Sequence, residues 1–238
     1  MNLGEIFSDA IRYPFSDITN FLIVGVLAVL ASLTEVVAPL GIDNGFVYLL
    51  AVIIGFIFSL IIAGYSLDVI KKGIEHSNDF PAIDLEANLI NGIKAIIISI
   101  VYLIIPIIIS FIIMALFGVI GAGIDHVVAS LGIASIIIII LFILFGIFEM
   151  IALAKFADTR DLGAALNIGA VLEDAQKIGI VKIIVFVIVV MIVALLATII
   201  ISIFAFIPYI GLIIATLLLG AFALLFASKA LGLLYSNA

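Results

Sequence analysis

Two acidic residues inside long apolar runs are the first candidates for chemistry in this sequence. Glu35 lies near the end of the first run, and Glu149 lies near the end of the fourth. A charge at the centre of a bilayer costs roughly 2.5–3.5 kcal/mol or more, so acids at that depth are typical of ion or proton sites. Both residues lie within about one helical turn of a predicted interface, where a long side chain reaches water. We therefore interpret them first as interfacial residues.

Hydroxyl side chains spread through the apolar runs form a second set of candidates. Together with the two acids they would line the path of a channel or transporter, and they are Ser99, Ser110, Thr198, Ser202 and Thr216. The same hydroxyls can instead serve only helix packing, because polar side chains inside a membrane often bond within or between helices. The sequence leaves both interpretations open.

The remaining reactive residues do not form a catalytic or metal-binding set. His76 and His126 fall on opposite sides of the predicted membrane, so they cannot share a metal ion. Asp125 beside His126 is more typical of a solvated turn than of a cation site. The chain has no cysteine, which excludes thiolate metal sites and cysteine nucleophiles. We expect no enzyme activity, no cofactor, and no catalytic or metal-binding residue.

The composition places these candidates in a membrane protein. Hydrophobic residues make up 67% of the 238 residues and charged residues 11%, and the mean hydropathy is +1.59. Soluble domains are about half apolar and about one quarter charged. The apolar runs are continuous rather than alternating, so they predict helices and not a β-barrel. The net charge of −7 argues against a nucleic-acid partner.

Six apolar runs are long enough to cross a membrane as helices. A hydrocarbon core of about 30 Å needs about 20 helical residues. The predicted spans are 18–38, 46–67, 95–120, 127–151, 181–207 and 212–234. Pro106 lies in the middle of the third span and predicts a kink or a tilt, since neighbouring helices can satisfy the carbonyl that proline leaves unpaired.

A short amphipathic segment precedes each pair of spans, with apolar and polar residues in helical periodicity. The polar faces are Glu5, Asp9 and Arg12; Asp84, Asn88 and Asn91; and Asp174 and Lys177. The apolar faces are Leu3, Ile6, Phe7 and Ala10; Leu85, Leu89 and Ile93; and Leu162, Ala165, Leu166, Gly169 and Leu172. These patterns predict interfacial helices that lie in the membrane plane.

The unit of one interfacial helix and one hairpin of spans occurs three times, in residues 1–75, 83–160 and 161–238, which we expect to form one membrane domain. Each unit has an even number of spans, so the repeats are parallel, whereas many transporters pair inverted repeats. The prediction is an all-α, polytopic fold of six transmembrane helices in three parallel-repeat hairpins. Asp68 precedes Lys71 and Lys72 at helix-neighbour spacing, which predicts a surface ion pair.

The basic residues give the orientation. All nine fall on the side shared by both termini and the two long loops, and they are Arg12, Lys71, Lys72, Lys94, Lys155, Arg160, Lys177, Lys182 and Lys229. Because positive charge is retained in the cytoplasm, the sequence predicts a multi-pass plasma-membrane protein with both termini cytoplasmic.

Two spans carry small residues at four-residue spacing. They are Gly55, Ser59 and Ala63 in the second span, and Ala194, Thr198 and Ser202 in the fifth. Small residues at this spacing let helices approach closely, so we predict packing faces within the chain or between chains. A face that is left over inside the chain would favour a homo-oligomer.

Several segments together resemble a known family. They are 10–15 (AIRYPF), 63–70 (AGYSLDVI), 92–106, which contains Gly-Ile-Lys and Val-Tyr-Leu-Ile-Ile-Pro, and 207–211 (IPYIG). These motifs, over nearly the whole chain, are similar to an uncharacterised prokaryotic, largely archaeal, membrane family, the domain of unknown function numbered four-zero-one-three. The resemblance implies six spans and carries no catalytic residue.

Two classes of function fit these observations. The first is a non-enzymatic protein that organises the membrane or scaffolds a complex, in contact with lipid and as a homo-oligomer. The second is a channel or transporter for a small solute or ion. A subunit of a larger membrane complex is compatible with either. A continuous line of water-accessible polar side chains would favour transport, and a dry core of leucine and isoleucine would favour the organising role.

Overall fold

The computed structural model describes residues 1–38, 44–117, 124–204, 206–207 and 210–238, and gives only the backbone for 124–131 and 133. Every element in these ranges is a helix, which confirms the all-α class. The elements are α1 (Leu3–Arg12), η1 (Tyr13–Phe15), α2 (Ile18–Ala31), α3 (Leu33–Val37), α4 (Gly45–Ile74), α5 (Leu85–Leu116), α6 (Ile124–Thr159), α7 (Leu162–Leu166), α8 (Ile168–Ile178), α9 (Ile180–Phe204), α10 (Gly211–Ala215), the π-helical turn η3 (Thr216–Gly220) and α11 (Ala221–Tyr235).

Five helical segments are long and apolar enough to cross a membrane: α4, α5, residues 134–159 of α6, α9, and the run from α10 through η3 to α11. The segment of α1 and η1 makes an 87° bend with α2, and this pair counts as a sixth candidate if it is one broken span. The prediction of a polytopic helical membrane protein is confirmed at this level. The predicted first span is broken at Ser32, where α2 ends and α3 begins.

The first predicted interfacial helix is a separate element, α1, and the third is divided at Asn167 into α7 and α8. The side chain of Asn2 accepts from Glu5 N at 2.9 Å while the Glu5 carboxylate accepts from Asn2 N at 2.9 Å, and this reciprocal cap begins α1. Gly179 has a φ of 97° between α8 and α9, a backbone conformation that favours glycine, so the chain turns sharply from the amphipathic helix into the apolar one.

The second predicted interfacial helix is not a separate element but continues into the long apolar helix. α5 runs unbroken from Leu85 to Leu116 and passes through Pro106. Asp84 is the N-cap, since its carboxylate accepts from the backbone N–H groups of Glu86 and Ala87. With only one cap at the start and no glycine-induced break before the apolar run, the amphipathic turns remain the first turns of the long helix.

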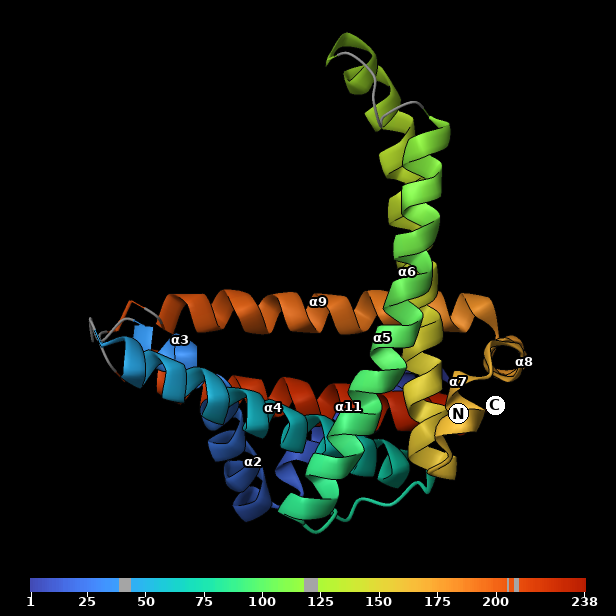
Figure 1. The fold of residues 1–238 in the computed structure, drawn as a ribbon. Coiled ribbons are helices and arrows are strands. Elements are labelled where there is room, and N and C mark those ends of the chain that lie inside the picture. The colour runs from blue at the N-terminus through green and yellow to red at the C-terminus, as the bar shows by residue number, and fades with distance from the viewer. Residues whose placement is uncertain (39–43, 118–123, 205, 208–209) are drawn as a thin grey trace.

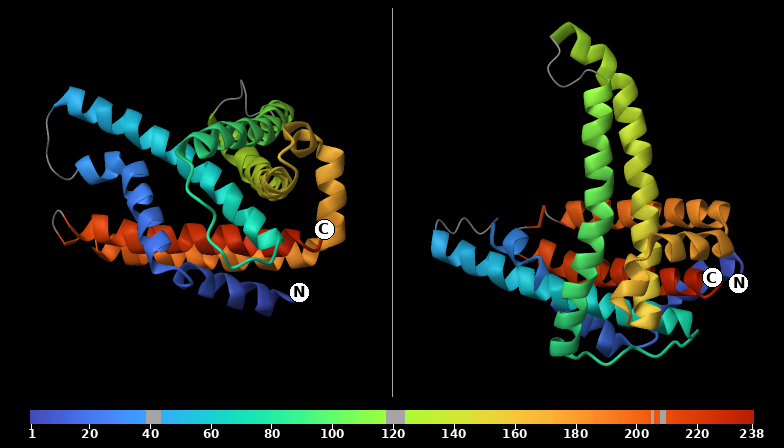
Figure 2. Two further views of the ribbon diagram at one scale, coloured as in Figure 1. Left: turned by 90° about the horizontal axis from the view of Figure 1, so that it is seen from below. Right: turned by 45° about the vertical axis from the view of Figure 1, so that its right-hand side comes forward.

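The predicted arrangement of three parallel-repeat hairpins is not confirmed by the structure. α9 and α11 run side by side, α4 packs against α11, and the α5–α6 hairpin stands across all three at a large angle (Figures 1 and 2). A flat bilayer has one normal, so helices that cross at such an angle cannot all span it with a small tilt. The long helices themselves are as predicted, and their common alignment across one membrane is not confirmed.

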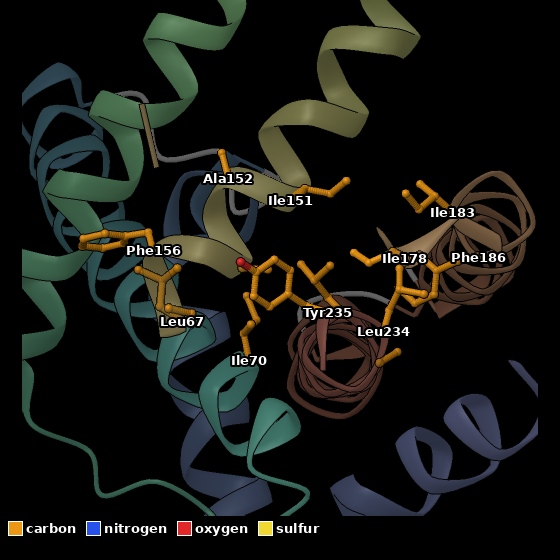
Figure 3. Close-up of a cluster of buried hydrophobic side chains, with 14 of the residues drawn as sticks. Leu67, Ile70, Ile151, Ala152, Phe156, Ile178, Ile183, Phe186, Leu234 and Tyr235 are labelled. Atoms are coloured by element: carbon orange, nitrogen blue, oxygen red, sulfur yellow. The ribbon is translucent and has the colours of Figure 1, made fainter. Parts of the chain in front are cut away.

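The main hydrophobic core lies where the two groups of helices meet. Leu67 and Ile70 of α4, Phe156 of α6 and Phe186 of α9 are among its buried members, and Tyr235 from the end of α11 lies among them (Figure 3). Away from this core the long helices are mostly exposed: only 11% to 39% of the most apolar window of each candidate span is buried. So much exposed apolar surface requires lipid or another protein chain to cover it.

Two helix crossings in this region depend on glycine. A Cβ atom on Gly64 of α4 would overlap the Asn88 carbonyl of α5, and one on Gly92 of α5 would overlap the Leu60 carbonyl of α4. Gly73 of α4 and Gly232 of α11 lie against each other, and a Cβ atom on either would overlap the backbone of the other helix. Backbone-to-backbone contact of this kind lets apolar helices gain van der Waals energy where hydrophobic drive is weak.

Candidate functional site

The polar side chains that bond between helices gather beside the main hydrophobic core, near both termini (Figure 1). The Arg160 guanidinium pairs with the Asp68 carboxylate, and the Asn88 amide donates to the other Asp68 oxygen at 2.6 Å. Asn88 is almost fully buried, and its own amide oxygen accepts from Asp84 N at 3.2 Å. These contacts connect the end of α4, the start of α5 and the residue after α6.

A second group connects α6, α8 and α11. Lys155 Nζ lies 2.6 Å from Asp174 Oδ2, and the Tyr235 hydroxyl donates to the same oxygen at 2.7 Å. Asp174 is buried, with 9% of its side chain exposed, and Lys155 has 16% exposed. Lys177 lies 3.9 Å from Asp174 at the rim. A buried ion pair is favourable only if additional hydrogen bonds satisfy the remaining polar atoms of both side chains, as the Tyr235 hydroxyl does for Asp174.

A third group holds Lys229 of α11. This lysine is 1% exposed, and its ammonium donates to the carbonyl of Ser77 and, at 3.4 Å, to the carbonyl of Lys72. The same ammonium lies 5.0 Å from the centre of the Tyr13 ring, which is within the range of a cation–π interaction. The contacts tie α11 to the end of α4 and to η1. We call the residues Asp68, Asn88, Lys155, Arg160, Asp174, Lys229 and Tyr235 the polar clasp.

Tyr13 extends the clasp toward the N-terminal segment. Its ring stacks on Phe80 with centroids 4.8 Å apart, and its hydroxyl donates to the Asp79 carbonyl at 3.3 Å. Burial raises the pKa of the Tyr13 hydroxyl, with a smaller contribution from the negative charge of Asp79, so the hydroxyl stays protonated and remains a donor. The bent N-terminal segment is thus held by its aromatic residue.

The ion pairs and hydrogen bonds of the clasp can hold helices together. Among the described residues, no group of three or more histidine, cysteine, aspartate or glutamate side chains is placed to hold a metal ion. Each carboxylate of the clasp is occupied by cationic or neutral donors from other elements. The clasp therefore joins α4, α5, α6, α8 and α11 at one end. Asp68 and Asp174 each pair with a cation from another element, and the Lys229 ammonium is held by backbone carbonyls and the Tyr13 ring.

Three of the five hydroxyl candidates for a polar path bond to their own helices. The Ser110, Thr198 and Ser202 hydroxyls donate to carbonyls four residues earlier, at 2.6 to 2.9 Å. Ser110 and Thr216 are buried in different elements, while Thr198 and Ser202 are exposed on α9. Ser99 is half-buried in α5. In-helix bonding satisfies a hydroxyl without any neighbour or water.

The two acids and the charged turn lie apart from these hydroxyls. Glu149 is half-buried in α6, and Glu35 is exposed in α3. Asp125 and His126 fall in the first turn of α6, where side chains lie outside the described part of the chain. Asp68 pairs with Arg160 and not with a lysine of its own helix, so the predicted surface ion pair with Lys71 and Lys72 is wrong. Arg160, which follows the end of α6, pairs with Asp68 in place of the lysines on the same helix.

The predicted interfacial residues divide between the surface and the interior. Leu85 and Ile93 are exposed, Leu89 and Asn91 are half-buried, and Asp84 is exposed at its cap position. Asn88, predicted on the polar surface, is buried against Asp68. On α8 two predicted positions are reversed: Asp174 is buried and Leu172 is 40% exposed, while Lys177 is exposed as predicted. Partners on α6 and α11 account for the reversal, because they satisfy the carboxylate.

The two predicted small-residue faces differ in use. Gly55 is buried, and a Cβ atom on it would lie 3.1 Å from the Ala31 carbonyl, so it marks a close approach of α4 to the end of α2. Ser59 is exposed and Ala63 is half-buried. On α9, the face of Ala194, Thr198 and Ser202 is exposed along its whole length. The first face is used inside the chain at one residue only, and the second is left uncovered.

Sequence reasoning missed most of the clasp. Lys229 was counted only for orientation, although a lysine inside the apolar run 212–234 is itself a signal, because a membrane lysine requires partners. Tyr235 and the inward side of Asp174 carry no comparable local signal. Their pairing depends on the meeting of three helices.

The resemblance to a domain of unknown function is confirmed by the comparison with known families. A family model described as "Protein of unknown function (DUF4013)" matches residues 47–206, from α4 to just after α9. The chain belongs to this family. No curated protein and no solved structure matches it. The DUF4013 region contains Asp68, Asn88, Lys155, Arg160 and Asp174, whereas Lys229 and Tyr235 of the clasp lie C-terminal to it.

Proposed function

We propose that this DUF4013 protein is a non-enzymatic, membrane-organising or complex-scaffolding protein that acts as a homo-oligomer or as a subunit of a larger membrane complex. The observation that carries the proposal is the uncovered apolar surface of α9. Ile184, Ile188, Leu195 and Ile203 are 45% to 60% exposed, and these positions form a broad apolar stripe along one side of the helix. Lipid and neighbouring chains are the partners that such a helix accepts.

The distribution of polar groups supports the organising role over transport. The core at the helix ends is formed by isoleucine, leucine, alanine and aromatic side chains. Thr198 and Ser202 face outward on α9, away from any shared interior with Ser110 of α5. A path for ions requires polar groups in succession along one cavity. The hydroxyls that would form such a path are distributed over several helices, and those of Ser110, Thr198 and Ser202 are already bonded within their own helices.

The uncovered face of Ala194, Thr198 and Ser202 is the proposed contact between copies. Small residues let two backbones approach, and the hydroxyls already satisfy themselves within α9, so the face is apolar in effect. Replacing Ala194 and Thr198 together with leucine is expected to convert the oligomer to the monomer while the fold is kept, because both positions are exposed. Native mass spectrometry of nanodisc preparations reads the change directly.

A matched control adds bulk to the opposite side of the same helix. Leu196→Phe with Ile203→Phe changes two exposed positions that lie about half a turn away from the small-residue face. This variant is expected to keep the wild-type mass. Loss of the oligomer in both variants would show a general dependence on α9 and would contradict the assigned face, as would an unchanged mass for Ala194→Leu with Thr198→Leu.

The proposal includes a plasma-membrane location with both termini in the cytoplasm. Its support is the one-sided distribution of basic residues and the closeness of the termini, where the Met1 ammonium donates to Asn237 Oδ1 at 3.1 Å. In intact cells, a membrane-impermeant thiol reagent is expected to label Asn44→Cys and to leave Ser77→Cys and Asp158→Cys unlabelled. Labelling of Ser77→Cys before permeabilisation would reverse the orientation.

A further inference from the structure

A charged cavity lies beside the Asp68–Arg160 pair of the clasp, where α4 ends and α6 has just ended. Its volume is about 290 Å³, and its walls include Asp68, Lys71, Lys72, Glu75 and Arg160. Pro81 and Ala82, from the loop before α5, complete it. The cavity therefore sits at the ends of two long helices, beside the loop that leads into a third.

The charges that line this cavity do not balance. Three cations, Lys71, Lys72 and Arg160, face two carboxylates, Asp68 and Glu75, which leaves a net charge of +1. Asp68 is occupied by Arg160 and Asn88, and Glu75 lies 3.5 Å from Lys72. Within the part of the chain that the structure describes, Lys71 makes no ion pair. One positive charge at the wall thus remains uncompensated.

Arg160 adds an unused donor. Its Nη2 atom pairs with Asp68, but its Nη1 atom is buried and has no hydrogen-bond partner among the described residues. The backbone of Arg160 has a φ of 55°, a left-handed conformation that is uncommon for residues other than glycine, asparagine and aspartate. The backbone thus places Arg160 directly after α6, where its guanidinium reaches α4.

We propose that this cavity binds the phosphate group of an anionic ligand, with the lipid headgroup as its source. Arginine and lysine are the residues that recognise phosphate oxygens, arginine through its planar fork and lysine as a point charge. Basic pockets between membrane helices on the cytoplasmic side are sites for anionic headgroups. The cavity has this charge and lies at the helix ends. The site does not depend on the oligomeric state proposed above.

The test compares three probes on the purified full-length chain in mild detergent. Short-chain phosphatidylglycerol, short-chain phosphatidylcholine and inorganic phosphate are each titrated while the thermal unfolding midpoint is followed. Phosphatidylglycerol is expected to raise the midpoint and phosphatidylcholine to leave it unchanged. An equal rise with inorganic phosphate would overturn the lipid as the source of the phosphate. No preference for phosphatidylglycerol over phosphatidylcholine would overturn the site.

Two variants locate the effect. Lys71→Gln is expected to weaken the apparent phosphatidylglycerol affinity about fivefold without loss of folding, since Lys71 makes no ion pair in the described structure. Lys177→Gln is the matched control, because it removes an equal charge from α8 at the same end of the molecule. Arg160→Lys keeps the charge and loses the fork, and is expected to weaken binding as well. Equal affinities for Lys71→Gln, Lys177→Gln and wild type would overturn the assignment.

Discussion

Replacing Gly92 with leucine is expected to separate α5 from α4 and to leave little folded protein. A Cβ atom at this position would overlap the Leu60 carbonyl, and Gly64 makes the reciprocal contact with Asn88. A backbone carbonyl inside a helix cannot turn aside as a flexible side chain does. Overpacking of a protein core typically lowers the folding stability by about 1–3 kcal/mol and occasionally by more. Because the clash is with backbone, we expect a loss at or above the upper end of this range.

The measurement is the unfolding midpoint in detergent, followed by circular dichroism during a denaturant titration. Gly146→Leu is the control, because Gly146 also lies inside an apolar span and a Cβ atom there meets nothing within 4 Å. The control is expected to stay close to wild type. A Gly92→Leu midpoint equal to that of Gly146→Leu would mean that α4 and α5 do not approach as closely as the structure shows.

Replacing Asp174 with alanine is expected to cost about 3–5 kcal/mol of stability, the range for breaking a buried ion pair by removal of one partner. The change leaves the Lys155 ammonium without its carboxylate and the Tyr235 hydroxyl without its acceptor. Glu173→Ala is the control, since the neighbouring Glu173 side chain is 68% exposed and pairs only with Lys177 among the described residues. A surface pair of this kind contributes about 0–1 kcal/mol.

Further variants can separate the contributions of Lys155 and Tyr235, the two partners of Asp174, to the folding stability. Tyr235→Phe is expected to cost about 1 kcal/mol, the usual value for one hydrogen bond. Lys155→Met combined with Asp174→Ala is expected to recover part of the loss, because it removes the uncompensated charge. If Asp174→Ala and Glu173→Ala shift the unfolding midpoint equally, then Asp174 is not buried against α6 and α11 in the protein in solution.

The long apolar helices were predictable because their signal is contained within one segment. The predicted run 46–67 corresponds to α4, and the run 181–207 corresponds to α9, with boundaries displaced by only a few residues at the start of each. At the C-terminal end of α4, helix continues to Ile74 through Lys71 and Lys72. Polar residues at a helix end mark the membrane boundary rather than the end of the helix.

The relative directions of the helices were not predictable from the same runs. The spans are apolar on nearly every face, as the exposed isoleucine and leucine positions of α9 show. A helix without a distinct polar face does not specify which side packs inward. The angle of the α5–α6 hairpin is fixed instead by contacts at its base, such as Gly92 against α4 and Phe156 in the core.

The candidate site was predictable only in part for a related reason. The spacing of Gly55, Ser59 and Ala63 suggested one packing face, yet the closest approaches of α4 use Gly64 and Gly73. Close approach is a property of two helices, and a pattern within one helix cannot reveal it. The same holds for Asp68, whose partner Arg160 is 92 residues away in the sequence.

The mass of the wild-type protein in lipid nanodiscs tests the organising role most directly. Native mass spectrometry across several lipid compositions and protein concentrations is expected to give one discrete oligomer, because we propose that the uncovered α9 face pairs identical copies in a closed, symmetric way. A chain that stays monomeric under all of these conditions, with no co-purifying membrane protein, would contradict the account.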